Sequence, residues 1–120
     1  MPEPLAIIAL RSVTRESRDR IIRERAAKIA EEIREGFKKA SEAGLFCYEY
    51  KISEEQNQAT EVIFEGIEHL LALEFRGLED YTQLWITSKK ETYKPASWFL
   101  YFGIRWDRPR QHQYEDISYG

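Results

Sequence analysis

The run from Thr14 to Ala43 constrains the fold most, because it has the pattern of one long amphipathic helix. Apolar residues recur in it every three or four positions, which places them on one stripe of a helix with 3.6 residues per turn. These residues are Ile22, Ala26, Ile29, Ala30, Ile33, Phe37 and Ala40. Acid-first pairs four residues apart, such as Glu24 with Lys28, favour the helix. Gly44 suits the left-handed residue that commonly ends a helix.

The segment before this helix is predicted to be separate from it. Leu5 to Leu10 is a short apolar run, and we expect residues 1–13 to form an arm or short strand whose apolar side chains pack onto the main body. A free arm that docks a partner is the alternative. Ser12 or Thr14 would then be the helix N-cap.

The predicted helix is too long for a compact domain. Thirty helical residues span about 45 Å, whereas a domain of this length has a radius of gyration of roughly 14 Å. Either the helix bends or breaks near Gly36, or one end projects and pairs with another subunit. The stripe could cover a sheet, or it could form a homodimer through Ile22, Ile29, Ile33 and Phe37.

Two further elements follow Gly44. The alternation of apolar and polar residues from Leu45 to Ile52 predicts a half-buried strand. Ser53 and Gln56 have the spacing of a capping box, which predicts a second helix that runs to about Leu73.

A competing interpretation applies to the same stretch. Gly66 is unfavourable inside a helix, and Val62 and its apolar neighbours suit a strand. The alternative is a pair of strands, at Thr60–Glu65 and Glu68–Arg76, that turn at Gly66.

The last third of the chain predicts two strands. Tyr81–Ser88 is one, Lys89–Ala96 is a polar loop, and Trp98–Trp106 is a second strand that is apolar at nearly every position. Such a strand is expected to be covered on both faces and central in its sheet. Residues 107–120 are predicted to be an irregular tail.

These elements predict a single α+β domain over residues 1–120. A long N-terminal helix would pack on an antiparallel sheet of three to five strands, with a second helix beside it. The helix stripe would lie against the side of the last strand that carries Trp98, Leu100, Phe102 and Ile104.

Composition excludes several classes of protein. The net charge is −3, so nucleic-acid binding is not favoured overall. Cys47 is the only cysteine, which excludes an intrachain disulfide and a multi-cysteine metal site. No stretch approaches the roughly 20 apolar residues of a membrane span. We expect a soluble, cytoplasmic protein that does not bind a membrane.

The order of elements resembles that of small uncharacterised domains carried by bacteriophages. The shared pattern is a helix, a Gly-Leu-Phe strand, a capped helix and a Leu-Trp-Ile strand, and it covers about Ala26 to Thr87. The resemblance implies a viral protein, either a virion part or an accessory factor that binds a host machine. It carries over no catalytic residue.

Residues with catalytic potential do not form a complete pattern. Glu49 and Lys51 have the acid-x-lysine spacing of restriction-type nucleases, which need a further carboxylate for a metal site. Cys47, His69 and His112 lack the spacing of a metal site or a nucleophilic triad. We therefore predict that the protein is not an enzyme and holds no metal or cofactor.

Charge is distributed unevenly, and this pattern gives the candidate binding residues. The stretch Ser53–Asp80 is strongly acidic, whereas Thr87–Gln113 is basic and rich in aromatic residues. Guanidinium groups beside flat rings are enriched at binding hot spots. The candidate binding residues are Glu61, Glu65, Glu68, Trp98, Tyr101, Arg105, Trp106, Arg108 and Arg110.

Three functions are compatible with these patterns. The first is a non-enzymatic binding protein, such as a phage or mobile-element accessory factor that acts on a host protein complex through charged surfaces. The second is a small-molecule or nucleotide binder with a pocket lined by Tyr48, Tyr50, Trp98 and Trp106, in which Arg105 holds an anion. The third is a metal-dependent nuclease.

Overall fold

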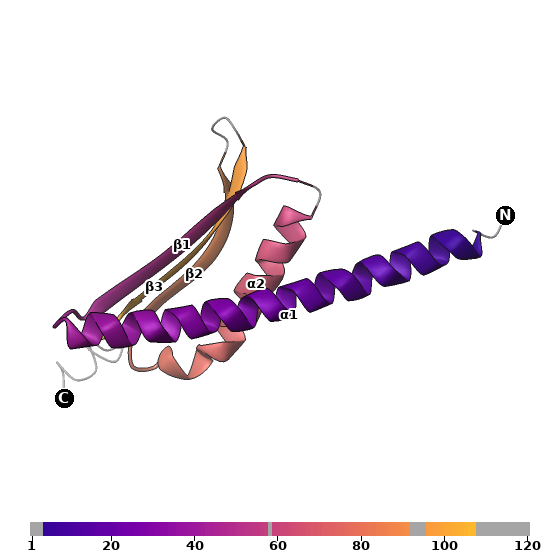
Figure 1. Cartoon of the computed structure of the whole chain (residues 1–120). Helices are drawn as coiled ribbons and strands as arrows, with labels where there is room; N and C mark the ends of the chain where they lie inside the picture. Colours follow the sequence, from indigo (N-terminus) through magenta and orange to yellow (C-terminus); the bar gives the residue numbers. More distant parts are fainter. Residues whose placement is uncertain (1–3, 58, 92–95, 108–120) are drawn as a thin grey trace.

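The computed structural model describes residues 4–57, 59–91 and 96–107. Along the chain it has helix α1, strand β1, helix α2, the short 3-10 helix η1, and strands β2 and β3 (Figure 1). Their bounds are α1 Leu5–Glu42, β1 Cys47–Glu55, α2 Thr60–Glu74, η1 Arg76–Leu78, β2 Gln83–Glu91 and β3 Ser97–Arg105. This arrangement confirms the predicted α+β class, with a long N-terminal helix, a second helix and a three-stranded antiparallel sheet.

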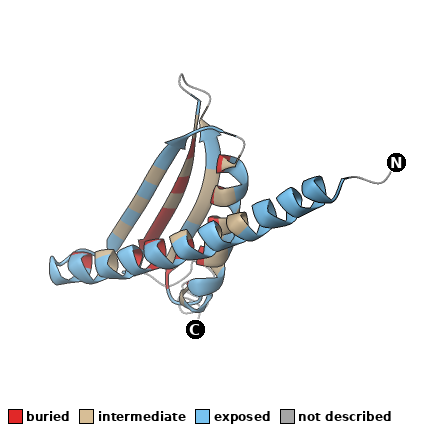
Figure 2. Cartoon of the chain, turned by 45° about the vertical axis from the view of Figure 1, so that its right-hand side comes forward, coloured by how far each residue is buried: buried red, intermediate tan, exposed pale blue. Residues whose placement is uncertain are grey.

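Strand β3 lies in the centre of the sheet, as its apolar sequence predicts. The strand order is β1-β3-β2, and β3 pairs antiparallel with both neighbours. Both helices lie on the same side of the sheet (Figures 1 and 2). The expectation that β3 is covered on both faces is wrong, because Phe99 and Tyr101 on the other face are only half-buried.

Helix α1 begins much earlier than its sequence pattern predicts. It starts at Leu5, directly after Pro4, so the predicted arm or strand is helical from that point. Thr14 is inside the helix rather than at its start, and its hydroxyl donates a hydrogen bond to the carbonyl oxygen of Leu10 at 2.8 Å. A hydroxyl bonded within its own helix cannot cap the helix N-terminus. At the other end, Gly44 has φ +81° and ends the helix as predicted.

Helix α1 is longer than the body of the domain, and part of it projects beyond the body. The helix continues through Gly36 without a break and ends at Glu42. A helix of 38 residues spans about 57 Å, and the molecule measures 68 × 32 × 26 Å with a radius of gyration of 18.7 Å. The N-terminal part of α1 therefore extends beyond the body of the domain (Figure 1).

The core lies between the helices and the inner face of the sheet. Its fully buried large residues are Ile33, Phe64, Ile67, Leu71, Leu100 and Phe102. The predicted match of the α1 stripe to the sheet is confirmed, since Phe37 stacks on Phe102 with ring centroids 6.0 Å apart. Ile29 and Ile33 are buried in this core, so the domain itself covers these two members of the predicted dimer stripe.

Residues 60–74 form a helix, so the alternative of two strands is wrong. Gly66 is tolerated because the side chain of Ile22 packs over it, and a Cβ there would lie 2.6 Å from Ile22 Cδ1. The predicted capping box is also wrong, because β1 continues through Ser53 to Glu55. Instead, the backbone N–H groups of Ala59 and Thr60 donate to Asn57 Oδ1 at 2.8 and 3.1 Å.

The remaining boundaries differ by a few residues. Strand β2 continues to Glu91, so the start of the predicted loop is part of the sheet. Leu84 and Ile86 face the core and Trp85 faces away from it, as the alternation of side chains along a strand requires. The predicted tail lies outside the described residues beyond Asp107.

Candidate protein-interaction surfaces

The N-terminal end of α1 exposes an unusual amount of apolar surface. We define the α1 tip as Leu5–Val13, where Leu5 is 84%, Leu10 62% and Val13 58% exposed. Ile7 and Ile8 are also exposed. In two views, no other described element lies beside the tip (Figures 1 and 2). A helix that is apolar around its circumference is normally buried by something else.

The apolar stripe of the tip does not continue the core stripe. Each residue of an α-helix is rotated by about 100° around the helix axis from the residue before it. This rotation places Ala6, Leu10, Val13 and Ile21 on one side of α1. By the same rule, Val13 lies about 160° around the axis from Ile33, which faces the core. The tip therefore presents its stripe away from the body of its own domain.

A groove runs along the other half of α1, next to the start of β1. We call it the α1–β1 groove, and its volume is about 760 Å³. Its floor includes Gly36, Ala40 and Leu45, and the adjacent Phe46 is 60% exposed. Its charged rim is formed by Lys28, Glu31, Glu32, Glu35 and Lys39. Sequence patterns missed this groove because two elements of different periodicity form it.

Side-chain alternation in β3 divides the predicted basic aromatic edge between two faces. Trp98 is buried in the core, and Trp106 packs near Phe37, with ring centroids 6.3 Å apart. Tyr101 and Arg105 lie on the opposite face of the sheet, since successive strand residues point to opposite sides.

The charged members of that predicted edge are not assembled into a cation site. Arg105 donates two hydrogen bonds to Asp107, from Nε at 2.6 Å and from a terminal nitrogen at 2.9 Å. The paired carboxylate raises the pKa of Arg105 and offsets its charge towards an external anion. Arg108 and Arg110 lie outside the described residues.

The predicted acidic residues lie on α2, but they are not equivalent. Glu61 and Glu65 are exposed, one turn apart on the helix. Glu68 is half-buried and accepts a hydrogen bond from the hydroxyl of Ser88 at 2.7 Å. Glu68 therefore helps to hold α2 against β2. Of the three predicted acids, Glu61 and Glu65 are the two that are exposed.

The aromatic residues predicted to line a ligand pocket do not surround a common cavity. Tyr48 lines the α1–β1 groove. Tyr50 donates a hydrogen bond to Glu32 at 2.8 Å, and burial followed by this carboxylate raises its pKa. Trp98 is near the start of β3, and Trp106 directly follows its end.

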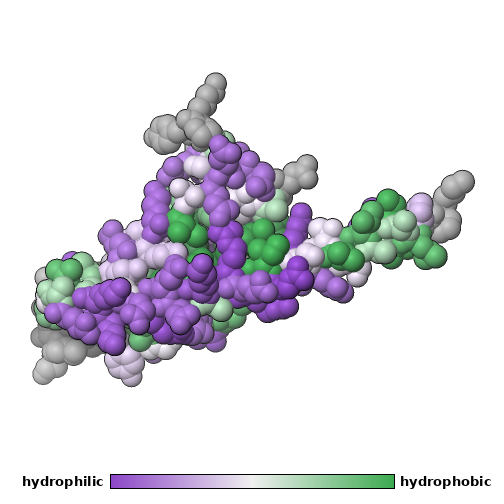
Figure 3. Space-filling view, viewed as in Figure 1, coloured by the Kyte–Doolittle hydropathy of each residue, from purple (hydrophilic) through white to green (hydrophobic). Residues whose placement is uncertain are grey.

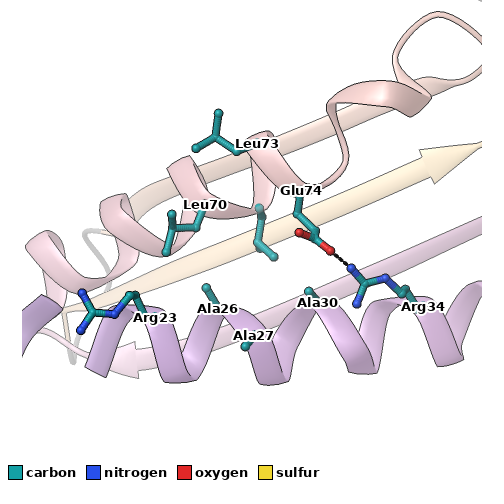
Figure 4. Close-up of a pocket in the computed structure, with 9 residues that line it drawn as sticks. Arg23, Ala26, Ala27, Ala30, Arg34, Leu70, Leu73 and Glu74 are labelled. Carbon is teal, nitrogen blue, oxygen red and sulfur yellow. Dashed lines mark ion pairs between the residues drawn. The ribbon is translucent and has the colours of Figure 1, made fainter. Parts of the chain in front are cut away.

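A second groove, between α1 and α2, has a volume of about 400 Å³ and no aromatic lining (Figure 4). Small residues such as Ala26 and Ala30 form its α1 side, and Leu70 and Leu73 lie opposite. The ion pair of Arg34 and Glu74 crosses one end of the groove. The charged residues that line this groove, Arg23, Arg34 and Glu74, lie at its two ends, and its middle is aliphatic.

The nuclease-like pair lies on the open face of the sheet. Lys51 Nζ is 4.4 Å from the ring centroid of Phe99 and 3.3 Å from Glu91 Oε1. Glu49 is near Tyr101, and burial together with that carboxylate raises the pKa of Tyr101. Within residues 4–57, 59–91 and 96–107, no three acidic, histidine or cysteine side chains are grouped to hold a metal ion. Cys47, at the start of β1, is exposed. Strand alternation from Leu45 to Ile52 predicts a core or semi-buried position for it, and this prediction is wrong.

Figure 3 shows apolar surface at both ends of α1. Between them, hydrophilic surface follows the helix itself, and further apolar surface lies above the middle of the helix. Among the described helices, none combines the length and apolar character needed to cross a membrane. Comparison with protein-family models, with curated proteins and with solved structures finds no match to this chain.

Proposed function

We propose that the protein is a non-enzymatic protein-interaction domain and that the α1 tip is its main binding surface. The observation that carries this proposal is the exposure of five large apolar side chains on a helix end that projects from a well-packed body. They are Leu5, Ile7, Ile8, Leu10 and Val13. Contiguous exposed apolar patches commonly mark interaction sites.

The energetics favour burial of the tip in a complex. Burial of one large aliphatic side chain contributes about 1.5–3 kcal/mol. Part of this gain offsets the translational and side-chain entropy lost on association. The tip is already helical and continuous with α1, so little further backbone ordering is needed when a partner binds.

The resemblance to phage-borne domains is consistent with this role. An accessory factor that binds a host protein complex needs a surface of this kind, and the exposed acids Glu61 and Glu65 would add charge selectivity at a separate place. The partner class remains a proposal that rests on the pattern of elements from Ala26 to Thr87.

Site-specific photo-crosslinking in cells that express the chain tests the proposal. A photoreactive phenylalanine derivative would replace Leu10, and in a matched control it would replace Ser12. Ser12 is exposed in the same helical segment but points about 160° away from Leu10, to the side that carries Leu5 and Ile8. The two positions therefore test whether the stripe of Leu10 and Val13 is the contact face. We expect a protein adduct of defined mass from position 10 and much less from position 12.

The opposite pattern would overturn the proposal. If neither position gives an adduct, or if both give the same diffuse set, the tip has no specific protein partner. The mass of an adduct also identifies the class of partner, because a second copy of the chain doubles the mass and a foreign protein adds its own.

A further inference from the structure

We infer that the partner of the α1 tip is a second copy of this chain, paired antiparallel along α1 so that each tip lies in the α1–β1 groove of the other copy. This inference rests on the proposed function of the tip and names its occupant. In this arrangement Leu10 of one copy lies opposite Lys39 of the other. The numbers of two residues that face each other then add to about 49, and the two-fold axis passes between the two α1 helices near Glu24.

The first support is that the stripe of the tip that carries Leu10 and Val13 lies on the same side of α1 as the groove. Leu10 and Lys39 are 29 positions apart, which leaves them within about 20° of each other around the helix axis. The core-facing side, represented by Ile33, lies about 120–140° away from both. Two α1 helices can therefore meet along this line while the two sheets remain on the outside, without a clash between the bodies.

The second support is the distribution of apolar surface along the helix. Ile7, Leu10 and Val13 are exposed on this side of the helix at one end, and Leu45 and Phe46 are exposed just beyond the other end. Figure 3 shows apolar surface at both ends of α1, with hydrophilic surface along the helix between them. An antiparallel pair brings the unlike ends together twice, whereas a parallel pair would leave each groove empty.

The third support is charge. The projecting half of α1, residues 5–20, has four arginines and two acids. The rim of the groove has three glutamates and two lysines. Antiparallel pairing places Arg18 near Glu32 and Arg20 near Glu31 of the second copy. Parallel pairing would place the arginines of both tips side by side, which is unfavourable.

The fourth support is the area that a stable dimer needs. A standard interface buries about 800 Å² on each partner, and the nine-residue tip is only about 13 Å long. One tip on one flat surface is too small. The two-fold arrangement uses two tips, two grooves and the whole length of α1, about 57 Å.

Disulfide trapping with the purified full-length chain tests the register. Exposed Cys47 is first replaced by serine, and Leu10→Cys or Lys39→Cys is then introduced singly, one variant with an affinity tag. After mixing and mild oxidation, we expect a disulfide-linked dimer that contains one chain of each variant. Leu10→Cys alone should remain unlinked, because its two thiols would be about 44 Å apart. Ser12→Cys mixed with Lys39→Cys is the control and should give little product.

Light scattering on the same proteins tests the pairing itself. Leu10→Glu is expected to raise the dimer dissociation constant at least tenfold, and Ser12→Glu is expected to leave it nearly unchanged. A monomer at every concentration overturns the inference, as does a Leu10–Leu10 disulfide, which indicates parallel pairing. Tip-dependent binding of a monomer to phosphatidylcholine vesicles also overturns it. A monomer whose position 10 crosslinks to a foreign protein in cells refutes the inference but leaves the proposed function intact.

Discussion

Replacement of Gly36 by alanine tests whether α1 crosses β1 as closely as the structure indicates. A Cβ at position 36 would lie 2.5 Å from Tyr48 Oη and closer still to two ring carbons. The ring also packs edge-on against Phe37 with centroids 6.1 Å apart, so a movement of the ring away from position 36 would give up part of that contact. Gly36 therefore leaves room for the ring of Tyr48 from β1, although glycine is a poor helix former.

Two opposing effects determine the size of the change. Alanine in place of glycine favours the helix by about 1 kcal/mol. Overpacking against a confined ring costs about 1–3 kcal/mol, with larger values where the neighbour cannot shift. Since this contact is far inside van der Waals distance, we expect a net loss of about 1–2 kcal/mol in the free energy of unfolding, measured by urea denaturation.

Two control variants separate these effects. Gly77→Ala should be close to neutral, because a Cβ there has no neighbour within 4 Å. In a Tyr48→Leu background, Gly36→Ala should become neutral or stabilising, since the ring is gone. If Gly36→Ala stabilises the unaltered chain by the full helix-propensity gain, the described contact between α1 and β1 is incorrect.

Three further predictions follow from the core, the α2 cap and the tyrosines. Ile33→Ala should reduce the free energy of unfolding by about 2–5 kcal/mol in urea, because Ile33 is fully buried; a loss below 1 kcal/mol would contradict its place in the core. Asn57→Ala should cost about 1 kcal/mol, since it removes the acceptor for two N–H groups at the start of α2, whereas Asn57→Asp should retain most of the stability. The pKa of Tyr50 is raised by burial and by its hydrogen bond to Glu32, so its contribution to stability is complete below pH 10 and declines as pH rises above that value. Tyr50→Phe should flatten this decline in alkaline unfolding curves, and an unchanged slope would refute the assignment.

Much of the fold is predictable from sequence because its periodicities are strong. The three-and-four spacing from Ile22 to Ala40 specifies the buried face of α1, and Gly44 specifies its end. The continuous apolar character of β3 specifies its central place. The pattern of residues 60–74 is ambiguous because Gly66 is unfavourable in a helix. The presence of Gly66 inside α2 is explained by the side chain of Ile22, which packs over it.

The start of α1 and the candidate surfaces were harder to predict. Leu5–Leu10 is apolar on every side, so it lacks the polar face by which an amphipathic helix is recognised. Its side chains are also exposed, so packing within the domain does not explain why this segment is apolar. Side chains alternate between the two faces of a strand, which puts Trp98 and Trp106 on one face of the sheet and Tyr101 and Arg105 on the other. The predicted basic aromatic edge is therefore inconsistent with the strand that contains it. The α1–β1 groove depends on how a helix crosses a strand, which local periodicity does not encode.

In the proposed dimer, the exposed tip of α1 pairs two copies of the chain. The solution mass of the purified protein tests this pairing directly, and it is measured by light scattering for the unaltered chain, Leu10→Glu and Ser12→Glu. We expect twice the chain mass for the unaltered protein and for Ser12→Glu, and the single-chain mass for Leu10→Glu with an unchanged free energy of unfolding. A single-chain mass for all three proteins, at concentrations up to the millimolar range, would contradict the claim.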